Sequence, residues 1–138
     1  MEKKETSIGA VVINSQNKFL LLFQRKASYW EFPKGHMEGV EDELVTMKRE
    51  VIEETGIKNY EVIDGFRHET MYSFERDDVH RQKKVIFYLV RTEDPVEISL
   101  EHKEYTWVDY EQAQEMVAFV EEKETLERVK NFLENYAK

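Results

Sequence analysis

Apolar runs and polar turns divide the first forty residues into short segments. "SIGAVVIN" (residues 7–14) is apolar and β-branched, as in a buried strand, and "KFLLLFQR" (18–25) has the same apolar character. The polar "NSQN" (14–17) between them predicts a turn, so we expect the two strands to pair as a hairpin. "KASYWEFPKGHMEG" (26–39) contains Pro33, Gly35 and Gly39 and is typical of a loop.

The rest of the chain alternates between helix and strand signals. Residues 40–55 have helical periodicity and are followed by Gly56, which favours a helix C-terminus. Residues 60–74, 83–92 and 105–109 are strand-like, with the charged "ERDDVHRQ" (75–82) predicted as a loop. Asp109 with Gln112 resembles a capping pair, and the last 28 residues are predicted helical with a break near Phe119. This order predicts an α/β (α+β) fold, with a mixed sheet between helical layers.

Composition narrows the class of protein. A chain of 138 residues with 41% apolar and 36% charged positions suits one folded domain over residues 1–138. There is no cysteine, no apolar run long enough for a membrane helix, and no apolar core of a secretion signal, so we expect a cytoplasmic protein without a membrane partner. The net charge of −9 disfavours binding to duplex nucleic acid, although a small anionic ligand could bind a locally basic pocket.

The helix at 40–55 concentrates carboxylates on one side. At about 100° per residue, Glu50, Glu53 and Glu54 fall within an arc of about 100°. Such like charges destabilise a helix by about 0.2–0.5 kcal/mol per pair, a cost that a bound cation relieves. We expect the opposite face to pack on the core; it comprises Leu44, Val45, Val51 and Ile52.

A solvated acidic surface and a structural Ca²⁺ helix are the alternatives for this segment. A charge run is most often a solvated surface. The Ca²⁺ alternative lacks the loop of alternating oxygen ligands that such sites use. Clustered carboxylates suit Mg²⁺ or Mn²⁺ rather than Zn²⁺.

The spacing around the helix decides against an ordinary acidic surface. Glu41 comes six positions after Gly35, and an Arg-Glu pair, a Glu-Glu pair, a glycine and an apolar residue follow at fixed intervals: Arg49-Glu50, Glu53-Glu54, Gly56 and Ile57. This pattern resembles the Nudix box, and the chain resembles the Nudix hydrolase family over nearly its full length. The resemblance implies an α/β/α sandwich and metal-dependent cleavage of nucleoside diphosphates linked to another group.

The resemblance also implies roles for individual residues. It places metal binding on Glu50, Glu53, Glu54 and the backbone carbonyl of Gly35, and on Glu101 as an extra ligand or alternative base. It assigns Glu41 and Arg49 to an ion pair that orients the helix, a structural role. For the general base Glu54 is our first choice and Glu50 the second, since a carboxylate among the ligands can take a proton from water.

One position departs from the family pattern. Relatives usually have a glycine directly before the position of Glu41, where this chain has Val40, with the glycine one residue earlier at Gly39. A β-branched residue tolerates positive φ poorly. We therefore expect the loop to turn one residue earlier than in relatives.

Segments outside the box predict the substrate. "WEFPKGH" (30–36) and "LEHKEYTW" (100–107) resemble segments of asymmetrical diadenosine tetraphosphate hydrolases, which form ATP and AMP. The alternatives are another Nudix pyrophosphohydrolase (RNA 5′-end, NTP or nucleotide-sugar) and a non-catalytic nucleotide sensor, which should lose the helix carboxylates. The candidate phosphate-binding cations are Lys34, His36, Arg25 and Lys84, although Lys83 and Lys84 alternate along a strand so that only one faces the pocket. The aromatic candidates for contacting a base or phosphate are Tyr72, Phe87, Phe132 and Tyr136.

Overall fold

The computed structural model describes the backbone of residues 2–136 and the side chains of residues 4–136. Eight strands and three helices follow one another along the chain. They are β1 (Glu2–Ile13), β2 (Phe19–Gln24), β3 (Trp30–Glu31), β4 (Lys34–His36), α1 (Glu43–Thr55), β5 (Glu61–Val62), β6 (His68–Arg76), β7 (Val79–Arg91), β8 (His102–Val108), α2 (Tyr110–Met116) and α3 (Val120–Tyr136). Within these residues, no helix is long and apolar enough to cross a membrane.

The strands form a single mixed sheet. Its central path runs β3-β2-β1-β7-β5, while β4 pairs with β1, β6 with β7 and β8 with β2. The long β1 and β7 run parallel from Glu2 opposite His80 to Ile13 opposite Arg91. The other pairings are antiparallel, including the predicted hairpin between β1 and β2. The expected mixed sheet is therefore confirmed.

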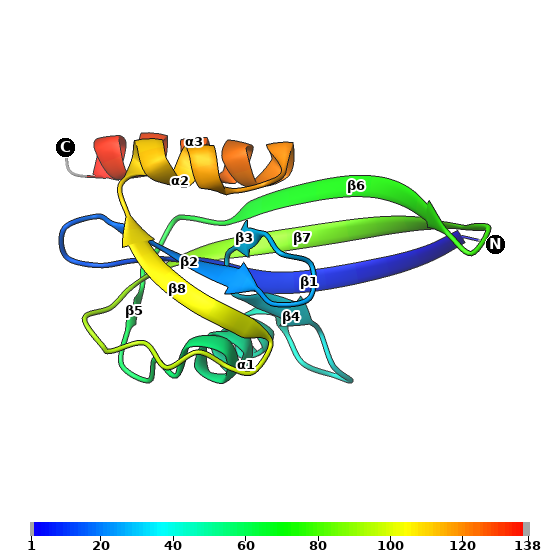
Figure 1. Ribbon diagram of the computed structural model, residues 1–138, viewed down its shortest axis with the longest axis horizontal. Coiled ribbons are helices and arrows are strands. Elements are labelled where there is room, and N and C mark those ends of the chain that lie inside the picture. Colours follow the sequence, from blue (N-terminus) through cyan, green and yellow to red (C-terminus); the bar gives the residue numbers. More distant parts are fainter. Residues whose placement is uncertain (1, 137–138) are drawn as a thin grey trace.

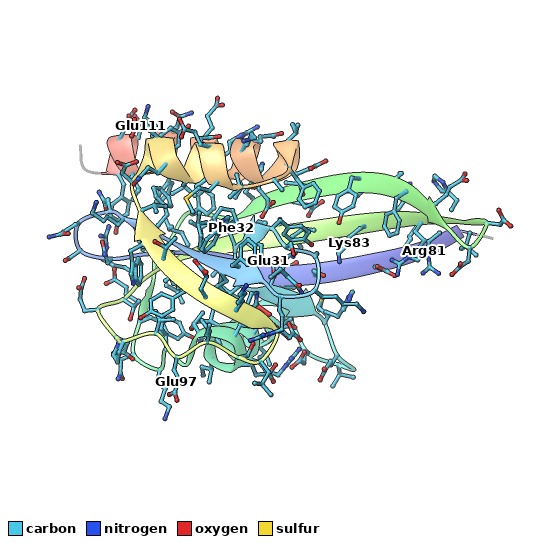
Figure 2. All side chains as sticks on the ribbon, viewed as in Figure 1. Glu31, Phe32, Arg81, Lys83, Glu97 and Glu111 are labelled. Carbon is cyan, nitrogen blue, oxygen red and sulfur yellow. The ribbon has the colours of Figure 1, made fainter. Side chains whose placement is uncertain are left out.

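Helices cover both faces of the sheet, with α2 and α3 on one side and α1 on the other (Figure 1). Strand alternation creates two cores: Val11 and Ile13 face the α2–α3 side, whereas Ala10 and Val12 face α1. Phe32 is fully buried on the α2–α3 side, near the centre of the molecule (Figure 2). A side chain of this size contributes about 1.5–3 kcal/mol when buried. This arrangement is the predicted α/β/α sandwich.

The segment 75–82 is not the predicted loop. Strands β6 and β7 continue through it and meet at a tight turn, where Asp77 and Asp78 have φ of 54° and 60°. Charged side chains are compatible with these strands because that end of the hairpin is largely exposed and the backbone pairing supplies the hydrogen bonds. The predicted strand 60–74 is instead divided into β5 and β6, with Gly65 at φ 94° between them.

The ends of the helices follow local capping chemistry. Helix α1 begins at Glu43, three residues later than predicted, because the Asp42 side chain caps it by accepting a hydrogen bond from the Val45 N–H at 2.8 Å. Gly39 has φ +54° and Val40 is fully exposed without positive φ. The loop therefore turns at Gly39, as expected.

Up to residue 136 the C-terminal segment is helical with a break, as predicted, while residues 137–138 of that prediction lie outside the described part of the chain. Asp109 and Gln112 form a capping box at the start of α2. The chain leaves α2 after residue 116 and begins α3 at residue 120. The break places the first turn of α3 beside the sheet, at the end of the cavity described below.

Candidate active site

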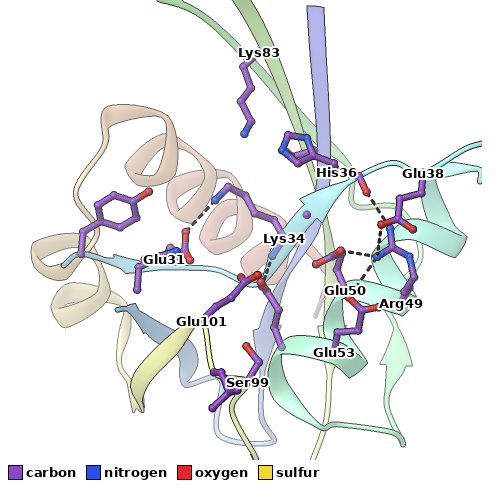
Figure 3. A pocket seen from close by; sticks show the side chains of 16 residues that line it. Glu31, Lys34, His36, Glu38, Arg49, Glu50, Glu53, Lys83, Ser99 and Glu101 are labelled. Atoms are coloured by element: carbon purple, nitrogen blue, oxygen red, sulfur yellow. Dashed lines mark hydrogen bonds and ion pairs between the residues drawn. The ribbon is translucent and has the colours of Figure 1, made fainter. Parts of the chain in front are cut away.

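A cleft of about 580 Å³ lies where α1, β4 and the loop before β8 meet. Figure 3 shows Glu50 and Glu53 of α1 on one side of β4 and Glu101 of that loop on the other, with the Lys34 side chain paired to Glu31 and Lys83 above them. Ionisable side chains dominate the lining, which combines parts of the chain that are far apart in sequence: Glu31, Lys34, Glu50, Glu54, Lys83 and Glu101 among others.

Two carboxylates of α1, Glu50 and Glu54, lie on its buried face, whereas Glu53 is exposed. Glu50 and Glu54 are only 8% and 5% exposed, and they lie on the same buried stripe as Met47 and Val51. The predicted apolar face is wrong in three of its four members: Leu44, Val45 and Ile52 are 43%, 49% and 43% exposed. The sheet and β4 hold α1 with the Glu50 and Glu54 edge inward, because this edge makes specific contacts there.

One of these contacts joins Glu54 to the "WEFPKGH" segment. The backbone N–H of Lys34 donates to Glu54 Oε1 at 2.9 Å. Burial raises the pKa of Glu54 to about 9, opposed by the Lys34 N–H and reinforced by the carboxylates of Glu31, Glu50 and Glu101. With this pKa, Glu54 holds a proton at neutral pH unless a further cation enters the cleft.

A second contact depends on the absence of a side chain at Gly35. A Cβ on Gly35 would lie 2.1 Å from Glu50 Cδ and 2.2 Å from both carboxylate oxygens. Glycine therefore lets the backbone of β4 approach the Glu50 carboxylate directly. Burial also raises the pKa of Glu50, although the Arg49 guanidinium opposes this shift.

Arg49 connects the loop and the helix of the Nudix-box pattern through hydrogen bonds. Its Nε and Nη2 donate to the two carboxylate oxygens of Glu41 at 2.7 and 2.9 Å. Nη2 also donates to the carbonyl of His36 at 2.9 Å, and Nη1 donates to Glu50 Oε1 at 2.7 Å. Such a bidentate pair lowers the pKa of Glu41 to about 2, mainly through the hydrogen bonds from Arg49. The ion pair implied by the box is thus present, and it connects the loop after β4 to the helix.

The donor set of the cleft fits a hard divalent cation. Glu54, Glu101 and His102 each offer a ligand atom, all within 4.8 Å of one another. Glu50 and Glu53 line the same cleft. Carboxylate oxygens in such a cluster are the ligands that Mg²⁺ and Mn²⁺ prefer. Burial and repulsion by neighbouring carboxylates keep Glu54 protonated, and a bound cation would offset both effects.

Sequence reasoning missed a buried pair beneath this cluster. His102 Nε2 lies 2.8 Å from Glu31 Oε2, and Lys34 Nζ donates to Glu31 Oε1 at 3.0 Å. Burial alone would raise the pKa of Glu31, but the hydrogen bonds from His102 and Lys34 outweigh it and the pKa lies below its ordinary value. The sequence did contain a signal for this pair, because Glu31 lies between the aromatic residues Trp30 and Phe32. A carboxylate that is buried in such a segment is rarely without a partner.

A model of the NUDIX domain matches residues 3–129. The chain belongs to the Nudix family. The asymmetrical bis(5′-nucleosyl)-tetraphosphatase of Mus musculus is 36% identical over 126 residues, which cover 87% of this chain and 83% of that protein. An RNA pyrophosphohydrolase of Pelagibacter ubique is 26% identical over 125 residues, covering 80% and 79%. A crystal structure of a C. elegans Ap4A hydrolase binary complex has a TM-score of 0.79, with 24% identity, and covers 95% of this chain and 98% of that one. The protein is therefore a Nudix hydrolase, an enzyme of the pyrophosphohydrolase class.

Two of the four predicted phosphate-binding cations line the cleft of this Nudix hydrolase, namely Lys34 and His36. Lys84 does not, because strand alternation turns it toward the α1 face and Lys83 faces the cleft instead. The Arg25 guanidinium is bound to backbone carbonyls, donating from Nε to the Leu100 carbonyl at 3.1 Å. Arg25 thus supports the loop that carries Glu101.

A second cavity of about 310 Å³ adjoins the cleft of the Nudix hydrolase and shares Tyr29, Glu31, Lys34 and Lys83 with it. We call it the aromatic pocket, since four rings line it: Tyr29, Tyr72, Phe87 and Phe119. Two of these, Tyr72 and Phe87, were predicted to contact the substrate.

The structure places the other two aromatic candidates, Phe132 and Tyr136, outside the lining of this pocket. Phe132 packs against Phe66 with ring centroids 5.5 Å apart and stacks with Tyr136 at 5.4 Å. Both lie at the C-terminal end of α3, whereas the first turn of α3 borders the pocket. The sequence signal for Phe119 was the helix break itself, which leaves an aromatic side chain in the connection.

Proposed function

We propose that this enzyme hydrolyses diadenosine tetraphosphate, and related dinucleoside polyphosphates, to ATP and AMP in a Mg²⁺-dependent (or Mn²⁺-dependent) reaction. The observation that carries the proposal is the continuity of the acidic cleft with the aromatic pocket through Tyr29, Glu31, Lys34 and Lys83. A polyphosphate fits beside the carboxylates and cations, and a terminal base fits among the rings. The names of the Mus musculus and C. elegans relatives support the same substrate.

The chemistry requires attack of a water oxygen on one phosphorus and departure of a bridging oxygen with the other product. Glu50, Glu53, Glu54, Glu101 and the Gly35 carbonyl would hold the divalent cation. When bound, such a cation lowers the pKa of water and neutralises charge on the phosphoryl oxygens.

The side chains of the cleft divide the remaining work. Glu54 accepts the proton of the attacking water, and it is ionised for this purpose only when positive charge in the cleft offsets its carboxylate neighbours. Lys34, His36 and Lys83 bind phosphate oxygens beyond the reacting bond. Arg49 and Glu41 position the loop and helix and do not touch the reacting atoms.

The deciding experiment is product analysis with Mg²⁺ over diadenosine tetraphosphate, 5′-triphosphorylated RNA, NTPs and nucleotide sugars. We expect ATP plus AMP from diadenosine tetraphosphate as the fastest reaction. Two ADP molecules as products, or faster reaction at RNA ends, would overturn the proposal. Glu54→Gln should lower kcat by about 10²-fold or more, since general base catalysis contributes about 10²–10⁴-fold. A Glu54→Gln enzyme with the wild-type rate would reassign the base, with Glu50 next.

The second candidate is RNA 5′-pyrophosphohydrolysis, favoured by the Pelagibacter ubique relative. The net charge of −9 disfavours long RNA but admits short 5′ ends. A small-molecule nucleotide therefore stays the proposed partner, duplex nucleic acid is not expected, and the cysteine-free composition fits the cytoplasm.

A further inference from the structure

The aromatic pocket contains polar groups that stacking on a base does not use. Strands β6 and β7 form the floor of this pocket, where Thr70 pairs with Val85 and Tyr72 pairs with Lys83. Directly paired residues on antiparallel strands present their side chains to the same face of the sheet. The first turn of α3 borders the pocket from the helical layer and contributes Glu122. Thr70 and Glu122 therefore approach one cavity from different layers.

Each of these side chains has a buried oxygen without a partner. Glu122 and Thr70 are each only 8% exposed. Glu122 Oε1 and Thr70 Oγ1 have no hydrogen-bond partner among the residues that the structure describes. Buried polar atoms in folded proteins nearly always find a partner, so two orphaned oxygens at one cavity indicate a ligand that supplies it.

The position of Glu122 is built into the helix. It occupies the stripe of α3 that packs inward, together with Thr125, Leu126 and Val129. Burial raises the pKa of Glu122 to about 7, an effect that Lys34 opposes and Glu31 reinforces. Above that pH Glu122 is a carboxylate, which only accepts hydrogen bonds.

The chemistry of the missing partner follows from these groups. Four rings around the cavity suit a flat heterocycle, and an ionised carboxylate suits two adjacent N–H donors. Guanine offers such a pair on its Watson–Crick edge, in N1–H and the N2 amino group. Adenine offers one amino donor, and its neighbouring N1 is an acceptor that repels the second carboxylate oxygen.

We propose that Glu122 and Thr70 bind the Watson–Crick edge of the base seated in the aromatic pocket, and that Glu122 makes the enzyme prefer guanine to adenine. This inference rests on the proposed function, since the phosphates of the same nucleotide would lie in the acidic cleft. It extends the substrates to guanosine-containing dinucleoside tetraphosphates, with Glu122 as a specificity-determining residue.

The test compares kcat/KM for diguanosine and diadenosine tetraphosphate at pH 8, where Glu122 is ionised. We expect the wild type to favour the guanosine substrate by about tenfold. In Glu122→Gln the amide presents one acceptor and one donor, which match adenine N6 and N1. The guanosine substrate should therefore lose about tenfold or more, while the adenosine substrate keeps its rate or gains. A guanine-to-adenine ratio that stays within twofold of wild type in Glu122→Gln would overturn the proposal.

Two further variants separate recognition from folding. Glu127→Gln removes the same charge from an exposed position of α3 and should leave the base ratio unchanged. Thr70→Val keeps the side-chain shape and should raise KM several-fold for both substrates. Unchanged KM values in Thr70→Val would exclude that residue from the site.

A binding measurement distinguishes failure of this inference from failure of the proposed function. Calorimetric titration with GTP and ATP in EDTA reports base preference without turnover. We expect GTP to bind the wild type about tenfold more tightly than ATP and to lose that advantage in Glu122→Gln. If GTP keeps this advantage while no dinucleoside tetraphosphate is cleaved, the proposed function fails and base recognition stands. Equal binding of GTP and ATP by the wild type would refute the recognition by Glu122.

Discussion

Replacing Gly35 with alanine places a methyl group where the Glu50 carboxylate now lies. The new Cβ would be 2.1 Å from Glu50 Cδ and 2.2 Å from its oxygens, whereas ordinary contacts to a Cβ are 3.4 Å or longer. The Glu50 carboxylate must therefore move by more than about 1 Å. A displacement of that size in a catalytic group costs about 10²-fold in rate, so we expect kcat/KM for diadenosine tetraphosphate to fall by about that factor.

The fold should survive the same substitution. The atoms that the methyl group meets belong to the end of a side chain, and the Glu50 side chain can rotate without a shift of the backbone. We therefore expect the free energy of unfolding, measured by urea titration, to fall by no more than about 1–2 kcal/mol. The result that identifies displacement of Glu50 is a large loss of activity with a small loss of stability.

Gly39→Ala is the matched control. A Cβ at Gly39 meets nothing within 4 Å, although its φ of +54° strains an alanine. This variant should lose about 1 kcal/mol of stability and keep activity within about threefold of wild type. If Gly35→Ala also keeps activity within threefold and the same Mg²⁺ dependence, Glu50 has no role that depends on its present position, and the reasoning from the close approach is refuted.

Three further predictions test the surrounding structure. In Arg49→Lys the ammonium cannot form the bidentate pair with Glu41 and also bind the His36 carbonyl. We expect the free energy of unfolding, measured by urea titration, to fall by about 1 kcal/mol and kcat to fall as well. Unchanged values of both would contradict the positioning role of Arg49. The hydrogen bonds from Arg67 are the main cause that lowers the pKa of Glu43 to about 2. The contribution of Glu43 to stability is therefore full above about pH 4.5 and is lost as the pH falls toward 2. Glu43→Gln should reduce the pH dependence of the urea unfolding midpoint over this range, and an unaltered dependence would count against the pair. Lys83→Met should raise KM for diadenosine tetraphosphate by about tenfold while Lys84→Met leaves it near wild type, and the reverse ranking would mean that the assignment of strand faces is incorrect.

Much of the fold follows from local pattern. The apolar strands 7–14 and 18–25, the helix ended by Gly56 and the capping pair at Asp109 all occur where the sequence predicts them, with shifts of a few residues at the ends. Such features depend on neighbours close in sequence, through side-chain periodicity and hydrogen bonds to the nearest backbone groups. The spacing of the box likewise identified the family, because it is a constraint along a single helix and loop.

The orientation of each element was less predictable. Periodicity places Glu50 and Glu54 on one side of α1, but the same helix could bury either its apolar or its acidic edge. The sheet decides this through the Lys34 N–H and the bare backbone of Gly35, contacts made by residues about twenty and fifteen positions earlier. In the same way, alternation on β7 allowed either Lys83 or Lys84 to face the cleft.

The sequence by itself therefore determined the family, the order of the elements and the acidic helix and loop residues that supply Glu50, Glu53, Glu54 and Glu101 to the cleft. Tertiary structure alone decided which side chains meet there: the buried pair of Glu31 and His102, Lys83 in place of Lys84, and Phe119 in place of Phe132. The physical reason is the separation in sequence between the residues that interact. Helix and strand patterns are set over a few residues, whereas a cleft is assembled by strand register and helix packing between segments such as Phe19 and Val108, which pair across the sheet from distant parts of the sequence.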